Sequence, residues 1–232
     1  MKTVVTIVPV LVFSLISLPV EVKKAGAMKN IMHKGDLSVY ISLDTLLTQQ
    51  HIYGLGPAEG IKGELIILDS KAYWCKAENG KINTSINNNA KAAMLVYTQV
   101  PAWKSVSITD KIKDYTAFEK IVEKIASQNG QSLEKSFPFM ITGNVVNASY
   151  LVIDWKEGIT HTFGNHTQFA RYGSFNKEPV ILLGFYSNKH QGIFAHHSTN
   201  IHVHITDKKK TVVGHIKEIS TSAASITLLI PQ

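Results

Sequence analysis

The spacing of apolar residues predicts two helices. Residues 42–50 carry leucines at helical spacing (Leu43, Leu46 and Leu47), with Ser42 as a candidate N-cap. Residues 116–128 open on the capping-box pattern Thr-Ala-Phe-Glu and place four apolar side chains on one face. Asn129-Gly130 is a typical end for this second helix.

The remaining apolar runs are short and predict strands. "ELIILD" and "KAYWCKA" form a predicted hairpin and "AAMLVYTQV" a further strand, while "YGLGPAEGIKG" and "NGKINTSINNN" are predicted loops. From residue 136 onward strands dominate: "FPFMITGNVVNASYLVIDW", "PVILLGFYS", "NIHVHIT", "TVVGHIKEI" and "SITLLIP". The pattern predicts an α+β fold with mixed or antiparallel sheets and few helices. It suggests an N-terminal α+β part over residues 28–135 and a C-terminal antiparallel part over residues 136–232.

The first residues predict a secretory signal peptide over residues 1–27. A basic start and an apolar run from Thr3 to Pro19 precede Ala25-Gly26-Ala27, which fits a small-x-small cleavage pattern. An uncleaved membrane anchor is the alternative, but Pro9, Pro19 and the shortness of the run disfavour it. We therefore expect a secreted or periplasmic protein that has no membrane association after cleavage.

Composition narrows the classes of partner. The formal net charge of +7 invites a nucleic-acid interpretation, but the lysines are scattered and Arg171 is the only arginine. Because base and phosphate recognition relies on the forked donors of arginine, we do not expect a nucleic-acid partner. The single cysteine, Cys75, excludes an intrachain disulfide framework.

Three of the ten histidines lie close together in "NIHVHITDKKKTVVGHIKEI". His202 and His204 point to the same face of a predicted strand, about 7 Å apart. A two-residue turn at Lys208-Lys209 would place His202 directly opposite His215 on the next strand. Any loop with an even number of residues keeps His215 on this shared face, whereas an odd loop sends it to the other face.

Three histidines with an open fourth position are typical of a catalytic zinc site. The alternative is a strand face with exposed histidines of no chemical consequence. A cupin-type site also uses His-x-His, but it adds a glutamate a few residues later, where this chain offers only Asp207. The histidine arrangement of carbonic anhydrases has similar chemistry, but nothing else in the chain resembles that family.

A proton donor for such a site can come from the segment "GLGPAEGIKGELIILD". Glu64 begins a strand and shares its face with Ile66 and Leu68, so its carboxyl group would be paired, metal-linked or raised in pKa. Glu59 lies in the loop before it and is a candidate for substrate binding. An exposed Glu64 at the mouth of the strand is the alternative.

Several segments together resemble the α-acetolactate decarboxylase family. "GLGPAEGIKGELIILDSKAY" is similar to the glycine-rich segment of that family, and "HVH…GH" to its histidine segments. "KGDLSVYISLDTLLTQQHIYGLG" and "VILLGFYS" extend the resemblance from about Asp36 to Glu218. The resemblance implies zinc ligands at His202, His204 and His215 and a functional glutamate at Glu64.

The sequence also departs from the family pattern. The family has an arginine that holds the substrate, but the matching segment "FPFMITGNVVNASYLVIDW" has none, and Arg171 cannot be aligned with it. The family's C-terminal glutamate is also missing before Gln232. The segment "HHSTN" before the predicted ligands offers His196, His197, Ser198 and Thr199 as replacements for the missing polar contacts, with His197 and Thr199 as the candidate substrate-binding residues.

The resemblance implies a divergent, zinc-dependent decarboxylase that converts 2-acetolactate, a 2-hydroxy-3-oxo acid, to acetoin. In this interpretation zinc stabilises the charge left when carbon dioxide departs, and Glu64 delivers the proton. A non-catalytic zinc-binding relative and a zinc hydrolase are the alternatives. The oligomeric state is left open, with a homodimer as one possibility.

Overall fold

The apolar runs of the sequence fold into two antiparallel sheets. The computed structural model describes residues 20–78 and 80–232. The strands of the six-stranded sheet are, in spatial order, β1 (Lys23–Ala25), β8 (Leu95–Gln99), β3 (Ile52–Pro57), β4 (Glu64–Leu68), β5 (Lys71–Glu78) and β6 (Lys81–Ile86). A separate two-stranded pairing joins β2 (Ile41–Ser42) to β7 (Lys91–Ala92).

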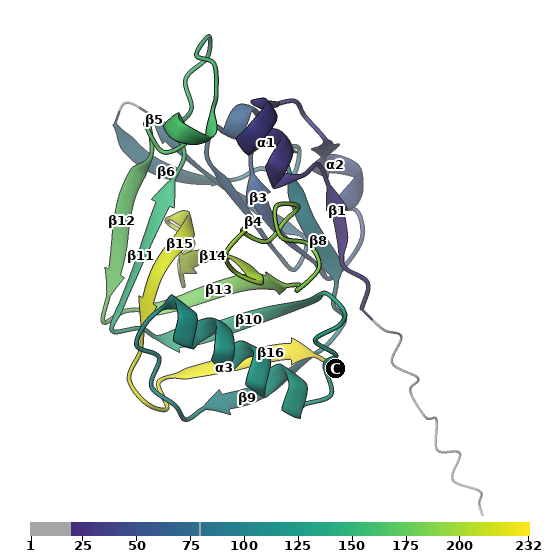
Figure 1. The fold of residues 1–232 in the computed structure, drawn as a ribbon, viewed down its shortest axis with the longest axis vertical. Coiled ribbons are helices and arrows are strands. Elements are labelled where there is room, and N and C mark those ends of the chain that lie inside the picture. Colours follow the sequence, from purple (N-terminus) through teal and green to yellow (C-terminus); the bar gives the residue numbers. More distant parts are fainter. Residues whose placement is uncertain (1–19, 79) are drawn as a thin grey trace, which may run out of the picture.

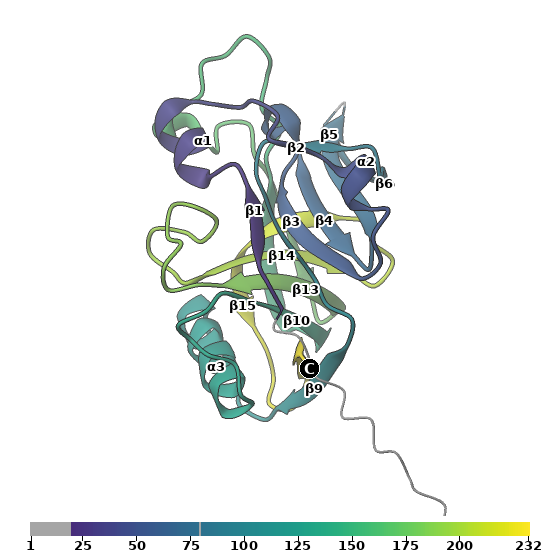
Figure 2. The same ribbon diagram turned by 90° about the vertical axis from the view of Figure 1, so that its right-hand side faces the viewer.

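The second sheet has eight strands and carries the C-terminal half of the chain (Figures 1 and 2). In spatial order they are β12 (Arg171–Asn176), β11 (Asn147–Val152), β15 (Val213–Ser220), β14 (Ile201–Asp207), β13 (Pro179–Tyr186), β10 (Phe137–Asn144), β16 (Ile226–Pro231) and β9 (Trp103–Ile108). The α-helices in the described ranges are α1 (Met28–Lys34), α2 (Leu43–Leu46) and α3 (Tyr115–Gln128), and short 3₁₀ turns lie at Glu59–Ile61 and Phe163–Asn165. Few helices and antiparallel sheets confirm the predicted fold class.

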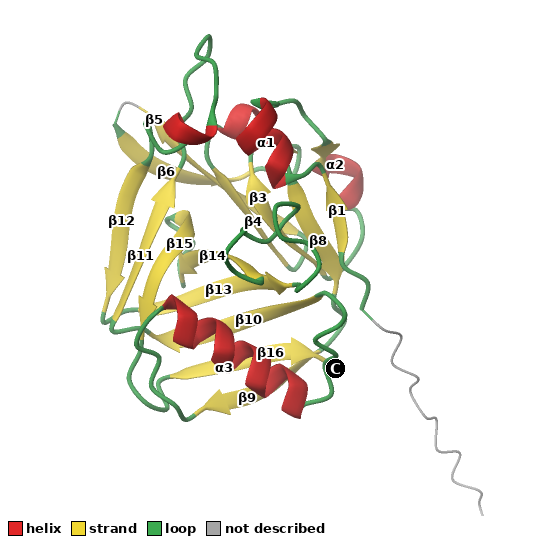
Figure 3. Cartoon of the chain, in the orientation of Figure 1, coloured by secondary structure: helices red, strands yellow, loops and turns green. Residues whose placement is uncertain are grey.

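One hydrophobic core runs between the two sheets. Leu55 and Ile66 of the six-stranded sheet belong to the same buried cluster as Val203 and Ile205 of the eight-stranded sheet. Helix α3 lies across β10 and β16, as Figure 3 shows, and joins the core through side chains that include Phe118. Burial of each such side chain contributes roughly 1.5–3 kcal/mol, so the shared core holds the two sheets together.

The chain passes from the first sheet to the second between β8 and β9. Strand β9 pairs with β16, and α3 packs against β15, so residues 103–128 lie with the eight-stranded sheet. This crossing point is N-terminal to the division predicted at residues 135/136.

Both helices differ from the sequence prediction at their ends. Helix α2 stops at Leu46, because the chain turns and reaches a positive φ of 61° at His51 before β3 begins. Helix α3 begins at Tyr115 and is capped by Asp114, whose carboxylate accepts a hydrogen bond from the Ala117 amide at 2.7 Å. The predicted capping box at Thr116 is therefore wrong, while the end at Asn129 is confirmed.

Two predicted loops are strands. "YGLGP" forms most of β3, and its glycines allow the chain to approach β8 closely: a Cβ on Gly56 would lie 2.1 Å from the Met94 carbonyl oxygen. "KINTSI" forms β6, an edge strand whose side chains are half-buried or exposed, so it lacks an apolar signature. Strands β9 and β12, at the two edges of the larger sheet, were not predicted either.

The predicted signal peptide lies mostly outside the described residues. Of its 27 positions, residues 20–27 are described, and Lys23–Ala25 pairs with β8 as β1. Cleavage after Ala27 stays a prediction, and it would remove β1 from the edge of the sheet. No helix within the described ranges is long and apolar enough to cross a membrane.

We predict that Gly63→Ala destabilises the protein strongly. Gly63 has φ +103°, and a Cβ there would lie 2.1 Å from the Cys75 carbonyl oxygen in the neighbouring strand. Backbone strain and the clash together should lower the free energy of unfolding by at least about 2 kcal/mol in urea denaturation. Gly158→Ala is the control, because Gly158 has φ +79° but open space around its Cα, and it should cost about half as much or less. Equal losses in both variants would contradict the close approach at Gly63.

Candidate metal centre

The hairpin of β14 and β15 brings the three predicted histidines to one face. The last register pair is Thr206 with Val213, so six residues separate the paired strands, and His204 lies opposite His215. The prediction of an even number of loop residues is confirmed. The predicted pairing of His202 with His215 is wrong, because His215 pairs with His204, two residues further along β14. The shared face survives because shifts of two residues preserve side-chain direction.

Asp207 explains the longer loop. Its carboxylate accepts hydrogen bonds from the amides of Lys209 at 3.2 Å and Thr211 at 2.6 Å, and its carbonyl accepts one from the Lys210 amide at 3.0 Å. Lys210 adopts a positive φ of 58°. An aspartate that accepts hydrogen bonds from several amides of its own turn lengthens the loop, so the second strand begins to pair further along the chain.

A fourth histidine completes the group. His196, in the connection between β13 and β14, places its Nε2 2.9 Å from Nε2 of His215. Nε2 of His202 lies 3.2 Å from Nδ1 of the same ring. One nitrogen from each of His196, His202 and His215 lies within 4.8 Å of the others, so these three residues can hold a metal ion. The His204 ring lies beside them, with its centroid 5.1 Å from that of His202.

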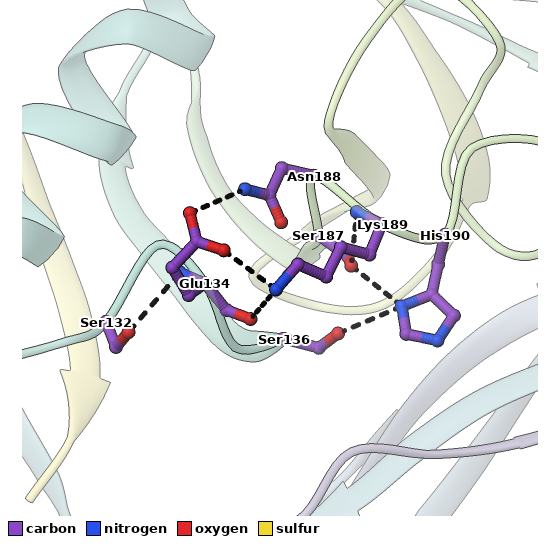
Figure 4. Close-up of polar contacts among 7 residues, drawn as sticks. All are labelled: Ser132, Glu134, Ser136, Ser187, Asn188, Lys189 and His190. Carbon is purple, nitrogen blue, oxygen red and sulfur yellow. Dashed lines mark hydrogen bonds and ion pairs between the residues drawn. The ribbon is translucent and has the colours of Figure 1, made fainter.

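Polar contacts fix the connection that carries His196. At its start, the Lys189 ammonium lies 2.7 Å from the Glu134 carboxylate, and Asn188 also donates to Glu134 (Figure 4). The Ser187 hydroxyl lies 2.8 Å from Nδ1 of His190, and that of Ser136 lies 3.3 Å from the same nitrogen. These contacts tie the connection to the segment between α3 and β10, which limits where His196 can lie.

Helix α1 closes over the same connection. Its first two amides, those of Met28 and Lys29, donate to the carbonyls of Ile193 and Gly192, both at 2.7 Å. These bonds satisfy amides that have no partner within the helix. The helix therefore stands next to the histidine group.

His204 is held between the two sheets. Its Nδ1 lies 2.8 Å from the carbonyl oxygen of Leu65 in β4, and because a carbonyl only accepts, Nδ1 carries the proton. Its Nε2 therefore presents a lone pair, and this atom is buried with no hydrogen-bond partner. Histidine ligands of metals commonly have this arrangement, with the second nitrogen donating to a backbone carbonyl.

Burial keeps the histidines neutral. Burial lowers the pKa of His204 to about 3 and those of His202 and His215 well below the usual histidine value. The pKa of His196 is also lowered, first by burial and then by the charge of His197. Neutral imidazoles have the free lone pairs that metal binding requires.

Glu64 lies beside this group and is buried, with 3% of its surface exposed. The alternative of an exposed Glu64 is therefore excluded. Burial raises its pKa to about 7, and a hydrogen bond from the Ile153 amide at 3.3 Å offsets part of the effect. Its Oε2 lies 3.5 Å from Nε2 of His204. Since His204 is neutral, this contact is not an ion pair.

A cavity of about 320 Å³ opens beside these groups. Glu64, His196, His202 and His215 line it, and much of the remaining wall is apolar. The apolar and methionine side chains come from α1, from β11 and β15, and from the turn and loop residues next to strands, namely Met28, Ile31, Met32, Ile61, Met94, Leu151, Ile153 and Ile216. An apolar cavity with a few convergent polar groups is the usual form of a small-molecule site.

Of the three predicted substrate-binding residues, only one lines the cavity. Thr199 lines the cavity, whereas His197 and Glu59 are not among its lining residues. The exposed ring of His197 instead meets His33 of α1, with their Nε2 atoms 3.3 Å apart. Glu59 lies in the 3₁₀ turn before β4.

Sequence reasoning missed four polar residues of the cavity wall. They are His166 and Thr167 from the loop after β11, Tyr115 from the start of α3 and Lys217 from the middle of β15. Burial lowers the pKa of His166 to about 4, and its Nδ1 lies 2.8 Å from Nε2 of His161. Lys217 lies two residues after His215 and so shares its strand face, a spacing that could have indicated it, whereas only the tertiary fold brings the other residues to the cavity.

The donor set fits a metal ion. Buried neutral imidazoles face one another, and the buried lone pair of His204 has no protein partner. The model of the alpha-acetolactate decarboxylase family matches residues 25–230. The chain belongs to this family.

Solved structures of alpha-acetolactate decarboxylases share the fold. One from Bacillus subtilis strain 168 is 16% identical, with a TM-score of 0.73 over 91% of this chain and 86% of that one. One from Bacillus subtilis subspecies spizizenii is 16% identical, with a TM-score of 0.74 over 91% and 85%. A Staphylococcus aureus protein of unknown function, similar to alpha-acetolactate decarboxylase, is 14% identical, with a TM-score of 0.72 over 91% and 84%. No curated protein matches the sequence.

We predict that alanine at His202, His204 or His215 weakens divalent metal binding more than alanine at His196. The lone pair of His204 is oriented by the Leu65 carbonyl, whereas His196 lies on a connection between strands. Metal content after dialysis, measured for each purified single variant, tests the order. Loss of metal in His196→Ala with retention in His204→Ala would assign the ligands to His196, His202 and His215 instead.

Proposed function

We propose that this member of the alpha-acetolactate decarboxylase family is a zinc-dependent enzyme that converts 2-acetolactate to acetoin. One observation carries the proposal: His196, His202 and His215 line the same small cavity as the buried Glu64 carboxyl group. Membership of the family supports the reaction. The size of the cavity suits a small 2-hydroxy-3-oxo acid.

Three histidine ligands with room for a further ligand favour zinc in a catalytic rather than a structural role. In our proposal His202, His204 and His215 hold the ion, and His196 stands beside them. Zinc, when bound, would supply a Lewis acid for the hydroxyl and ketone oxygens of the substrate.

Glu64 is the proposed proton donor. Loss of carbon dioxide leaves an electron pair on carbon, and that carbon must receive a proton to give acetoin. The carboxyl group of Glu64 lines the cavity, and a pKa of about 7 leaves much of it protonated near neutral pH. The Ile153 amide, which donates to Oε1, orients the carboxyl group and favours its ionised form once the proton has left.

The apolar wall supports the same chemistry. Side chains such as Met94 and Ile153 keep bulk water from the reacting carbon and strengthen the contacts of the few polar groups. Thr199 offers a hydroxyl group to the substrate from the start of the hairpin.

We predict that Glu64→Gln retains zinc but loses turnover of acetolactate by roughly 10²-fold or more, the usual scale for a general acid or base. The side chain keeps its size, so metal content and the far-ultraviolet circular dichroism spectrum should match those of the wild type. Acetoin formation by the zinc-loaded protein is the measurement.

Glu59→Gln is the matched control, because Glu59 lies in the same segment but not in the cavity wall. It should retain nearly full activity. Normal turnover by Glu64→Gln would refute its role as the acid. Zinc binding without acetoin formation by the wild type would instead favour a non-catalytic relative.

Export is a separate proposal that rests on the sequence of residues 1–27. N-terminal sequencing of protein recovered from outside the cytoplasm would test it. A mature chain that begins near residue 28 is the expected result, and an intact Met1 in all recovered protein would contradict cleavage.

A further inference from the structure

The cavity wall contains one residue with a permanent positive charge. Lys217 is the only lysine or arginine that lines it among the described residues. Its side chain is exposed, and the ammonium lies 5.5 Å from the centre of the Tyr172 ring. An exposed residue that also lines a cavity lies at its mouth.

Lys217 lies two residues after His215 on β15, at a β-bulge. Ser149 pairs with Glu218 and Tyr150 with Ile216, so Lys217 is the extra residue on β15. His215, Ile216 and Lys217 are consecutive, and all three line the cavity. Side chains two residues apart share a strand face, so Lys217 lies on the face that carries His215, and the bulge leaves it without a partner on β11.

Tyr115 contributes a hydroxyl group without a partner. Its oxygen is buried and makes no hydrogen bond with any described residue, although the residue lines the cavity. Helix α3, which begins at Tyr115, packs against β15, the strand of Lys217. A buried hydroxyl without a partner is costly, and a ligand in the cavity can supply the missing acceptor.

We propose that Lys217 and Tyr115 form the subsite that binds the carboxylate of the substrate. The inference rests on the proposed function and names how the acid group is recognised. The substrate would lie with its carboxylate toward the mouth and its ketone toward the histidines. Lys217 supplies the charge and Tyr115 a directional hydrogen bond, a combination that distinguishes an acid from a neutral ketone.

The chemistry sets which kinetic constant should change. Negative charge leaves the carboxylate as carbon dioxide forms and moves toward the ketone. A cation on the carboxylate therefore stabilises the bound substrate at least as much as the transition state. Removal of this contact raises KM and has a smaller effect on kcat.

Zinc-loaded Lys217→Met and Tyr115→Phe proteins test the proposal. Lys217→Met should raise KM for acetolactate about tenfold or more, and Lys217→Arg should restore most of the loss. Tyr115→Phe should raise KM about threefold to tenfold while the protein remains at least as stable as the wild type, because the removed hydroxyl had no partner. Lys209→Met in the hairpin turn and Tyr97→Phe in β8 are matched controls that should leave KM unchanged.

A binding measurement separates this proposal from the proposed function. Calorimetric titration compares 2-hydroxy-2-methylpropanoate with its neutral methyl ester, neither of which can be decarboxylated in the proposed manner. The wild type should prefer the acid, and Lys217→Met should lose most of that preference. An unchanged preference and an unchanged KM in Lys217→Met would overturn the subsite. Absence of acetoin formation with the acid preference intact would overturn the reaction but not the subsite.

Discussion

The hydrogen bond between His204 and the Leu65 carbonyl connects the two halves of the site. It crosses from the eight-stranded sheet to the six-stranded sheet at a distance of 2.8 Å. Because Leu65 follows Glu64 along β4, the same contact brings the carboxyl group of Glu64 to 3.5 Å from the other nitrogen of the ring. A shift of one sheet against the other would break this bond, expose the Nδ1 proton of His204 to an apolar core and separate the carboxyl group from the histidines. The packing of the two sheets therefore also determines the geometry of the site.

The parts of the structure that depend on side-chain alternation could be predicted from the sequence. The His-x-His spacing places His202 and His204 on one face whatever the strand pairs with, and an even loop adds His215. The exact register could not be derived, because Asp207 binds amides on the far side of the turn. The glycines of β3 led to the prediction of a loop where the structure has a strand. Gly54 approaches Tyr97 of β8 and Gly56 approaches Met94 just before that strand, contacts that cannot be seen from the sequence of β3 alone.

His166 and Tyr115 had no sequence signature that placed them in the cavity. They come from a loop and a helix start, where direction depends on tertiary contacts rather than on strand periodicity. The ion pair of Glu134 with Lys189, for example, helps to hold the connection that carries His196, and the two partners are 55 residues apart. Local patterns cannot anticipate contacts of this range.

The distribution of unpaired polar atoms indicates where the fold gives up stability for function. Among the described residues, six buried side-chain atoms lack a hydrogen-bond partner, and three of them belong to His202, His204 and Tyr115 at this site. A buried atom of this kind costs free energy, and under our proposals the metal would satisfy Nε2 of His204 and the substrate the hydroxyl group of Tyr115. Under our proposals, charge in the cavity is arranged by depth. Lys217 meets the carboxylate at the mouth, and the neutral histidines and Glu64 lie where charge develops. Decarboxylation moves negative charge from the first region to the second, where Glu64 and, when bound, zinc would stabilise it, while Lys217 contributes to the binding of the acid.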